Sequence, residues 1–521
     1  MRLYLNILIL FFTMQVLGQT KVSPKLYAKD LKEANLFFET EDYLRAINSY
    51  KKVLAHNPTH EKANLNSAIS RIKLNQPIDS CYINLLKLKT SKLPEVQFYF
   101  GLIYHLSSNF DEAVVCYNKY RNIPEKLRLI NDMEVDYYIS CSNNAKEFMS
   151  QPHRSRIKNI GEQVNSAYAD YVPLITSDEN TMYFTSRRPG GTGNLTDAYG
   201  NYYEDVYMVQ KNTDGTWSTP KNMGAPINTN THDACVALSF DGNQMIIYRT
   251  AADMLTGDLY VCRTDFNGWS EPQKFGPEIN TPHIETSACF SNDTSVIYFS
   301  SNKPGGMGGK DIYRIKKLPN GRWSMPMNLG PTINTERDED SPYLHPDGET
   351  LYFSSKGHNT MGDYDVFKTV LNTETNKFST PENLGYPINT VNNDIFFVLN
   401  VSGTRGYYSS IKEDTYGGSD IYIIDTRFGD NDLKVKHCKV VFGNEVRKAK
   451  ITLIDIESKQ VSGIYNASAK TGKFLMVMNP VKSYKAIIEE DGFQTMIVDI
   501  EPLANDHDAD TELILSLTKK N

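Results

Sequence analysis

The 521-residue sequence predicts a multidomain fold, with helical repeats first, a repeated all-β region second and a small β-sandwich last. Three observations predict it. Apolar residues recur at helical spacing in the first third, one thirteen-residue pattern occurs four times in the middle, and short alternating runs separated by glycine turns fill the last part. A chain of this length exceeds what one hydrophobic core usually supports, so several domains are expected.

Residues 25–150 are predicted to form helical repeats. The segments 42–58 and 110–124 carry apolar residues at helical spacing, and they end at Pro58 and Pro124, which lie 66 residues apart. That separation is about twice the 34-residue period of tetratricopeptide repeats, which this region resembles. Such repeats stack into a solenoid whose groove binds peptides or proteins. A plain helical bundle is the alternative.

The middle of the chain, residues 155–428, is predicted to be a β-propeller. The pattern reads WSTPKNMGAPINT at 217–229, WSEPQKFGPEINT at 269–281, WSMPMNLGPTINT at 323–335 and FSTPENLGYPINT at 378–390. A second signature, Asp followed by an aliphatic and an aromatic residue, recurs every 53 to 55 residues, at Asp205, Asp258, Asp311, Asp365 and Asp420. Each copy reads as four short strands. Because one such sheet cannot bury both faces alone, the series predicts a ring of five blades, with six as the alternative.

The propeller is predicted to close through its N-terminal segment. The chain leaves the repeats after the fifth copy of the third strand, so the last blade lacks an outer strand. Residues 156–166, RIKNIGEQVNS, match the second half of the thirteen-residue pattern and are expected to supply that strand. With SVIYFSSNKPGGMGGKDIY at 295–313 and DGETLYFSSKG at 347–357, the repeats resemble WD40-like (PD40) propeller repeats of the TolB type.

Residues 433–518 are predicted to form a small β-sandwich. Its strands are separated by turns such as Gly443-Asn444 and Asp491-Gly492. The segments from Gly443 to Leu453 and from Ser468 to Phe474 resemble those of carboxypeptidase regulatory-like domains. The resemblance implies a support or adhesion module without peptidase chemistry.

The N-terminus is predicted to be a secretory signal peptide over residues 1–18. Arg2 precedes the apolar run 3–12, and Val16 and Gly18 stand at the −3 and −1 positions of a cleavage point. The run is too short to span a bilayer stably, which argues against an uncleaved anchor. We therefore expect a periplasmic protein without a direct membrane span and with peripheral association with the outer membrane.

The order of these parts resembles a group of Bacteroidetes cell-envelope proteins related to OmpA-family and type IX secretion components. Those proteins often end in an OmpA-like domain that binds peptidoglycan, and no such peptidoglycan-binding segment is recognised here. The resemblance implies partners among other envelope proteins, bound through the tetratricopeptide groove and the propeller rim.

Composition excludes several function classes. The net charge of −7, from 55 basic and 62 acidic residues, gives no attraction to nucleic acid. The seven cysteines form no CxxC pair and have no histidines at zinc spacing, so we expect no metal and no cofactor. A Cys116–Cys141 disulfide stays open. The glycine-rich run 304–309 joins two strands and does not open a helix, which favours a tight loop over a phosphate site.

Charged residues that recur once per blade are the candidate site. Five acids begin inner strands, and four bases lie in the loop after the second strand: Asp170, Asp233, Glu285, Asp340 and Asp394, and Arg188, Lys303, Lys356 and Lys412. Some five-bladed glycosidases place carboxylates around such a funnel. Recurrence at equivalent positions instead favours acid–base pairing around a partner-binding rim, because catalytic acid and base need different environments.

The sequence therefore predicts a non-enzymatic, exported scaffold for protein interactions, accessory to secretion or outer-membrane assembly. No catalytic site is expected. The alternative is a carbohydrate-binding or glycoside-cleaving propeller, which aromatic side chains near the funnel beside unequal carboxylates would favour.

Overall fold

The computed structural model describes residues 23–197, 200–254, 256–265, 268–425, 433–469, 471–503 and 511–520. The predicted signal peptide lies outside the described residues. The chain divides into two compact units, residues 1–99 and 100–521. This division falls inside the helical region, whereas the sequence suggested boundaries near residues 150 and 430.

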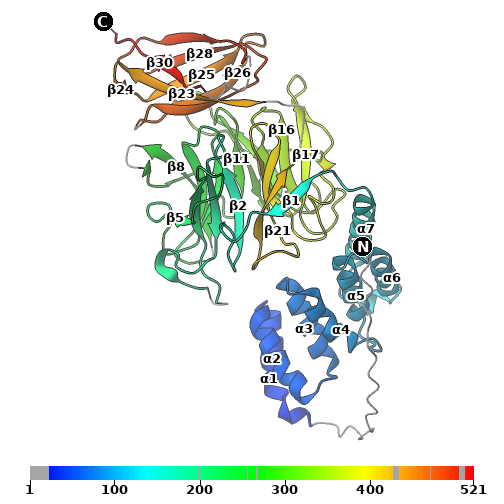
Figure 1. Cartoon of the computed structure of the whole chain (residues 1–521). Helices are drawn as coiled ribbons and strands as arrows, with labels where there is room; N and C mark the ends of the chain where they lie inside the picture. Colours follow the sequence, from blue (N-terminus) through cyan, green and yellow to red (C-terminus); the bar gives the residue numbers. More distant parts are fainter. Residues whose placement is uncertain are drawn as a thin grey trace. The chain divides into compact units, whose positions relative to one another are not determined.

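Seven α-helices and three short 3₁₀ helices lie in the described part of the chain (Figure 1). The α-helices are α1 (Ala28–Glu39), α2 (Tyr43–His56), α3 (Glu61–Lys73), α4 (Ile78–Leu86), α5 (Glu95–Leu106), α6 (Phe110–Arg121) and α7 (Asp132–Ser150). The 3₁₀ helices are η1 (Pro24–Leu26), η2 (Glu125–Leu127) and η3 (Thr192–Asn194). Helices α2 and α6 end just before Pro58 and Pro124, as predicted, since proline cannot continue a helix.

The first unit is built by packing consecutive helices, with α1 against α2, α2 against α3 and α3 against α4. Its core contains Ala46, Tyr50 and Ala63, and the Tyr50 hydroxyl is fixed by hydrogen bonds with Asn35 at 2.9 Å and Asn66 at 2.8 Å. The helical prediction is confirmed, while the tetratricopeptide assignment stays a prediction. Across the described residues, none of the helices combines the length and apolar character that crossing a membrane requires.

Five antiparallel sheets of four or five strands follow, each running from an inner to an outer strand. The strands of the first three are β2 (Asp170–Ile175), β3 (Thr181–Ser186), β4 (Asp205–Gln210) and β5 (Lys221–Asn222); β6 (Asp233–Leu238), β7 (Gln244–Thr250), β8 (Gly257–Asp265), β9 (Gly268–Trp269) and β10 (Gln273–Lys274); and β11 (Ala288–Phe290), β12 (Val296–Ser301), β13 (Asp311–Lys316) and β14 (Met327–Asn328). Those of the last two are β15 (Glu339–Leu344), β16 (Thr350–Ser355), β17 (Asp365–Asn372), β18 (Lys377–Phe378) and β19 (Glu382–Asn383); and β20 (Ile395–Leu399), β21 (Arg405–Ser410), β22 (Asp420–Asp425) and β1 (Arg156–Asn159).

The inner strands form a closed ring. Strand β2 contacts β6, β6 contacts β11, β11 contacts β15, β15 contacts β20, and β20 contacts β2. Apolar clusters fill the spaces between neighbouring sheets, such as the one that joins Val172 and Leu174 of β2 to Cys235 of β6. This arrangement is a β-propeller.

The N-terminal segment completes the last sheet, as predicted. Strand β1 pairs antiparallel with β22, with Arg156 opposite Asp425 and Asn159 opposite Tyr422 (Figure 1). The outer edge of the last sheet is therefore made by residues that precede the whole propeller in sequence.

The repeated thirteen-residue pattern contains the outer strand and the loop that crosses to the next sheet. In the copy 323–335, Asn334 donates to the Ile312 carbonyl at 3.0 Å and accepts from the Ile312 amide at 2.7 Å. Its neighbour in the pattern, Asn328, donates to Asp311 at 2.7 Å and accepts from Gly330 at 2.8 Å. Because the buried backbone of the third strand needs these partners, the sequence of the loop recurs with the sheets.

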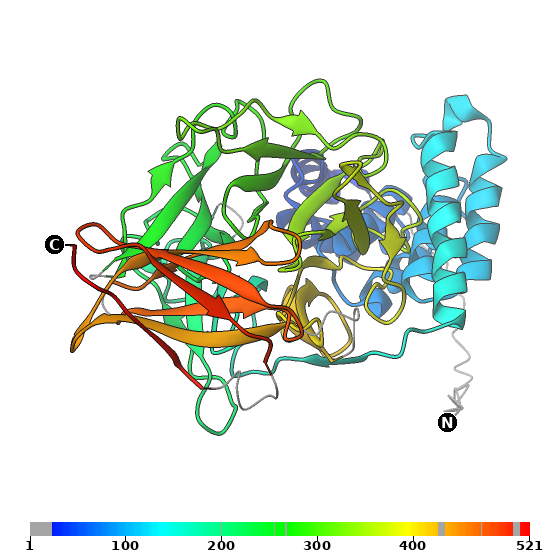
Figure 2. The same cartoon turned by 90° about the horizontal axis from the view of Figure 1, so that it is seen from above.

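The last part is a two-sheet sandwich (Figure 2). Its strands are β23 (Lys434–Phe442), β24 (Glu445–Val446), β25 (Ala449–Asp455), β26 (Val461–Ala467), β27 (Lys473–Met478), β28 (Tyr484–Glu489), β29 (Met496–Ile500) and β30 (Leu513–Ser516). Strand β30 pairs parallel with β23, and Ile451, Tyr465 and Met476 lie in the apolar core between the sheets. The sandwich is present, while its regulatory-like assignment stays a prediction.

Helix α7 is fixed to the propeller by polar and ring contacts. Tyr137 donates to the Gly362 carbonyl at 3.1 Å, and the Arg337 guanidinium lies 2.8 Å from the Glu134 carboxylate and 4.0 Å from the centre of the Tyr137 ring.

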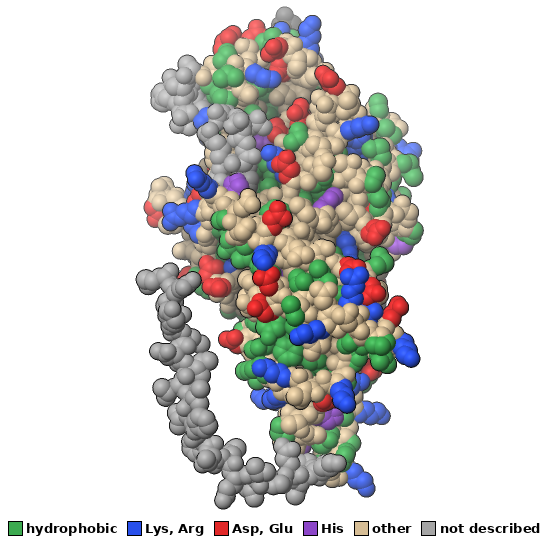
Figure 3. Space-filling model, turned by 90° about the vertical axis from the view of Figure 1, so that its right-hand side faces the viewer, with side chains coloured by type: hydrophobic (Ala, Val, Ile, Leu, Met, Phe, Trp, Pro, Cys, Tyr) green, Lys and Arg blue, Asp and Glu red, His purple; other side chains and the backbone are tan. Residues whose placement is uncertain are grey.

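The surface of the protein carries charges of both signs. Figure 3 shows acidic and basic side chains interspersed on the face drawn there, consistent with the modest net charge.

Candidate functional site: the mouth of the central channel

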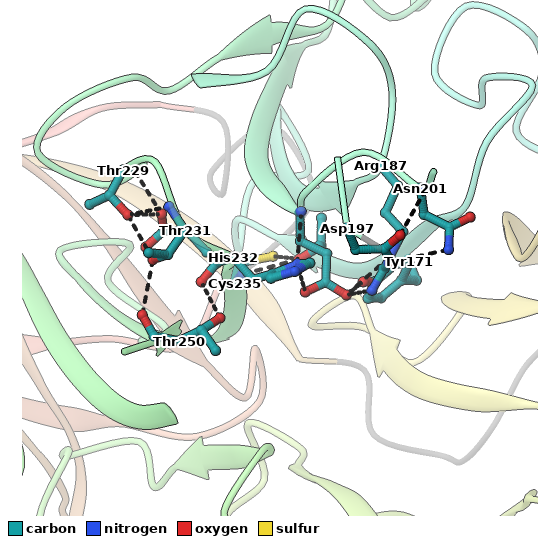
Figure 4. A network of polar contacts seen from close by, with 12 residues as sticks. Tyr171, Arg187, Asp197, Asn201, Thr229, Thr231, His232, Cys235 and Thr250 are labelled. Atoms are coloured by element: carbon teal, nitrogen blue, oxygen red, sulfur yellow. Dashed lines mark hydrogen bonds and ion pairs between the residues drawn. The ribbon is translucent and has the colours of Figure 1, made fainter. Parts of the chain in front are cut away.

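The predicted ring of acids is largely structural. Asp233 accepts hydrogen bonds from the Thr229 amide at 2.6 Å and hydroxyl at 2.7 Å, and its carboxylate lies 2.5 Å from Arg249. Asp170, Glu285 and Asp394 make the same contacts with Ser166, Thr281 and Thr390. All four are buried. They anchor the end of the crossing loop to the next inner strand, and Figure 4 shows the Thr229 end of this network.

The prediction of Asp340 as the fourth acid of the ring is wrong by one residue. Glu339 occupies the equivalent position, since it accepts from the Thr335 amide and hydroxyl, both at 2.7 Å, and from Ser355 at 2.7 Å. Burial raises the pKa of Glu339 to about 7 despite these hydrogen bonds. Asp340, the next residue, points to the other side of the strand because side chains alternate.

The predicted bases differ in their roles. Arg188 pairs with Asp170 at 2.6 Å and Lys412 with Asp394 at 3.9 Å, as expected. Lys303 instead lies 3.8 Å from the centre of the Tyr313 ring, with no hydrogen-bond partner for its ammonium among the described residues.

Lys356 belongs to a different group of contacts. Its ammonium lies 2.7 Å from Asp363 and 4.0 Å from Asp338. The pairing of Arg249 with Asp233 was not predicted, because Arg249 stands where the other sheets have serine.

At two positions of the repeat, the residue differs from one sheet to the next. The residue before the first Asp of the third strand is Glu204, Gly257, Lys310, Tyr364 or Ser419, and the residue after the acid of the inner strand is Tyr171, Ala234, Thr286, Asp340 or Ile395. The two positions meet, because Tyr171 donates to Glu204 and Lys310 donates to Thr286 at 3.0 Å. Glu204 and Lys310 were not predicted as site residues, because they stand at positions that do not recur between sheets.

Glu204 is the centre of the first polar cluster. It accepts from Tyr171, and its carboxylate lies 2.7 Å from Arg187 and 3.1 Å from the ring nitrogen of His232. Burial alone would raise the pKa of Glu204, but the hydrogen bond with His232, the charge of Arg187 and the Tyr171 hydroxyl lower it to about 2. Glu204 is therefore ionised at neutral pH.

Aromatic rings and a second acid lie around this cluster. The Tyr203 and His232 rings have centres 4.4 Å apart. Figure 4 shows Tyr171, Arg187 and Asp197 close together, with Asp197 3.7 Å from Arg187.

Asp340 and Lys310 form the second cluster, contributed by neighbouring sheets. The Lys310 ammonium lies 2.8 Å from Asp340, which also accepts from the hydroxyls of Ser287 and Ser300. Burial acts to raise the pKa of Asp340, but the charge of Lys310 and these hydrogen bonds hold it below its usual range. Lys310 keeps 23% of its side-chain surface exposed, so the pair can be reached by a ligand.

Three residues next to these clusters have a strained backbone. Val172, Ser341 and Phe396 have φ of 53°, 52° and 60°, the left-handed region that non-glycine residues rarely adopt. Each lies at an interruption of the inner-strand register. Such bulges redirect side chains, and strain of this kind gathers at functional sites.

A channel runs between the inner strands from these clusters. Its volume is about 70 Å³, and its lining contains Thr286, Ser287 and Phe396. Thr286 accepts from Lys310, and the Phe396 ring stacks on Tyr171 with centres 6.1 Å apart. We call the two polar clusters beside this end, Tyr171, Arg187, Glu204 and His232 and Thr286, Lys310 and Asp340, the channel mouth; of these residues Thr286 lines the channel itself.

No group of three or more His, Cys, Asp or Glu side chains within the described residues could hold a metal ion. All seven cysteines are buried free thiols, including Cys116 and Cys141. In the run 304–309 the amides of Met307 and Gly308 donate to Asp311 at 2.6 and 3.2 Å, so this loop is occupied by the protein's own carboxylate.

Comparisons with known proteins find similarity in structure alone. No protein-family model and no curated protein matches the chain. Similar solved structures include a thermostable family-43 glycoside hydrolase (TM-score 0.33, 14% identity, 51% of this chain and 92% of that one). An α-L-arabinofuranosidase from Lactobacillus brevis (0.34, 14%, 53% and 96%) and the Bacillus subtilis levansucrase (0.34, 11%, 51% and 84%) are also similar.

These comparisons correct two predictions from the sequence. The similar solved structures are glycoside hydrolases, an arabinofuranosidase and a levansucrase, all of them carbohydrate-active enzymes. These similarities speak against the prediction of a non-enzymatic scaffold and against the prediction that the chain is not an enzyme, and they agree better with the carbohydrate alternative. At these identities the likeness concerns the fold only.

Proposed function

We propose that the protein is a carbohydrate-active propeller that binds a saccharide at the channel mouth. The observation that supports the proposal is that equivalent positions at this end of the channel hold different residues in different sheets, among them Glu204, Lys310 and Tyr364. Residues that serve only the architecture recur in every sheet, as the Thr229-type contacts do. Residues that differ between sheets serve something else.

The chemistry of the mouth suits a ligand rich in hydroxyl groups. A hydroxyl both donates and accepts, so it can bridge a fixed carboxylate and a fixed cation. Glu204 beside Arg187 and Asp340 beside Lys310 supply two such pairs. The Tyr171 and Tyr203 rings add apolar faces beside them, and a few placed polar groups with aromatic walls are typical of small-molecule sites.

Glycoside cleavage is the second candidate, and one observation favours it. Neighbouring carboxyl groups at the start of β15 have pKa values displaced in opposite directions, with Glu339 raised to about 7 and Asp340 lowered. Acid and base roles require carboxyl groups whose pKa values differ in this way, although these two side chains point to opposite sides of β15. Glu339 is buried, however, so it can act as an acid only if its contacts with Thr335 open.

The wider assignments belong to the same proposal. The five sheets would be the complete set of blades, and the helical and sandwich regions would be tetratricopeptide and regulatory-like modules of a periplasmic protein. The channel mouth carries the carbohydrate function in either case.

The test measures saccharide binding and cleavage with the full chain. Affinity electrophoresis against a polysaccharide panel is expected to show retardation by at least one polysaccharide, which Glu204→Gln and Lys310→Met each weaken at least tenfold. Lys485→Met, which removes a charge beside Asp499 in the sandwich, is the control and should bind normally. Cleavage would be established if the wild-type protein releases reducing ends from a polysaccharide and Asp340→Asn does not. Binding that neither mouth variant changes would overturn the proposal.

A further inference from the structure

Behind the polar mouth, the channel is walled mainly by apolar side chains. Val172, Val236, Ala288, Pro342, Phe396 and Val398 are among the residues that line it. They come from all five inner strands, so the apolar surface surrounds the space. A strand of six residues is about 20 Å long, and lining residues occur along each inner strand, for example from Phe396 to Leu399 in β20.

The far end of the channel is polar again and is held by contacts between sheets. Ser177 donates to the Phe240 carbonyl at 2.5 Å, and Asn292 donates to the Pro346 carbonyl at 2.5 Å. The apolar section therefore lies between two polar ends. A saccharide alone would leave its hydroxyl groups without partners there, at a cost in free energy for each one.

We propose that this section binds the alkyl or aryl group of a glycoconjugate whose saccharide lies in the mouth. The inference rests on the proposed function and narrows its ligand class. A peptide is a poorer occupant, because its backbone amides and carbonyls would lack partners along an apolar wall. The contacts of Thr286 with Lys310 and of Phe396 with Tyr171 join the two parts of the site.

Matched glycosides separate the contribution of the alkyl group to the affinity from that of the sugar. Calorimetric titration of the full chain would use methyl and n-octyl β-glycosides of glucose, galactose and mannose, with the octyl compounds below their micelle concentration. Each buried methylene adds on the order of fourfold in affinity. At least one octyl glycoside is therefore expected to bind at least tenfold more tightly than its methyl partner.

Two variants of one residue locate the octyl chain. Val236, half-buried in β6, lines the channel. Val236→Phe narrows the space and Val236→Ser removes apolar contact, so both should reduce the octyl advantage to less than threefold while any binding of the methyl glycoside is unchanged. Val370→Phe is the control, since Val370 is 38% exposed in β17 and is not part of the channel wall.

The outcomes distinguish this inference from the proposed function. Equal affinities within every pair, or an octyl advantage that survives both Val236 variants, would overturn the inference and leave saccharide binding at the mouth intact. Failure of all octyl glycosides to bind would also overturn it, while the polysaccharide panel decides the proposed function separately. Loss of binding in Lys310→Met for both members of a pair supports the shared site.

Discussion

Asn159, in β1, donates its side-chain amide to the carboxylate of Asp420, at the start of β22, at 2.7 Å and across 261 residues of sequence. The same contact joins Asn222 to Asp205, Asn328 to Asp311 and Asn383 to Asp365, each at 2.7 Å and within one repeat. The segment before the propeller therefore uses the repeat's own contact to complete the last sheet.

Substitution of Asn159 should weaken this closure. Asn159→Ala removes a donor to Asp420 and an acceptor for Gly161 and Asn165. We expect a loss of about 1–3 kcal/mol in the free energy of unfolding, because buried partners are left unsatisfied. Hydrogen exchange should accelerate in β22, measured by mass spectrometry.

The matched control for closure is Asn222→Ala, which breaks the equivalent contact inside the first sheet. Its effect on stability should be similar, but exchange in β22 should stay slow. If both variants leave β22 equally protected, the N-terminal strand does not hold the last sheet.

Two glycines of one loop should differ sharply in their tolerance of alanine. A Cβ on Gly308 would overlap the backbone carbonyls of Thr335 and Arg337 in the next crossing loop, and backbone cannot move aside cheaply. Gly305 has φ of 89° and open space around it. We expect Gly305→Ala to cost about 1 kcal/mol from backbone strain and Gly308→Ala to cost clearly more, measured by urea unfolding. Equal losses would contradict the packing of the loop.

Stability should fall with rising pH through the titration of Glu339. Burial raises its folded pKa to about 7, above the unfolded value near 4.3. The stability that protonated Glu339 contributes to the folded state is therefore fully present below the unfolded pKa. It is lost as pH rises through 7, by on the order of 3 kcal/mol.

In Glu339→Gln this component should disappear, because the amide does not titrate. The measurement is urea unfolding between pH 5 and 8, and the difference between the two proteins isolates the one carboxyl group. Parallel stability curves for the two proteins would show that Glu339 is not protonated in the folded state.

His105 should destabilise the junction of α5, α7 and the propeller in acid. Its ring nitrogen lies 2.9 Å from the Ser142 hydroxyl, and burial lowers its pKa to about 4. Stability is present above the unfolded pKa of about 6.5 and is lost as pH falls toward 4, since the buried ring resists protonation. Wild-type protein should lose more stability than His105→Gln between pH 7 and 5, followed by thermal unfolding. A greater loss in the variant would contradict this.

The sequence alone determined the local structure and the connectivity of the propeller. Pro58 and Pro124 end helices because proline lacks an amide and clashes with the preceding turn. The pairing of β1 with β22 could be predicted because residues 156–166 carry the asparagines of the repeat, whose contacts are the same in every sheet. Repetition therefore reveals the residues that build the architecture.

Only the tertiary structure decided which residues form the candidate site. Glu339 and Asp340 are adjacent acids, and a shift of one residue along a strand moves a side chain to the opposite face. The sequence could not choose between them, whereas packing buries Glu339 against Thr335 and aims Asp340 at Lys310 of the neighbouring sheet. Glu204 and Lys310 break the repeat and are distant in sequence. They reach one channel mouth because the ring closes, which no local pattern encodes.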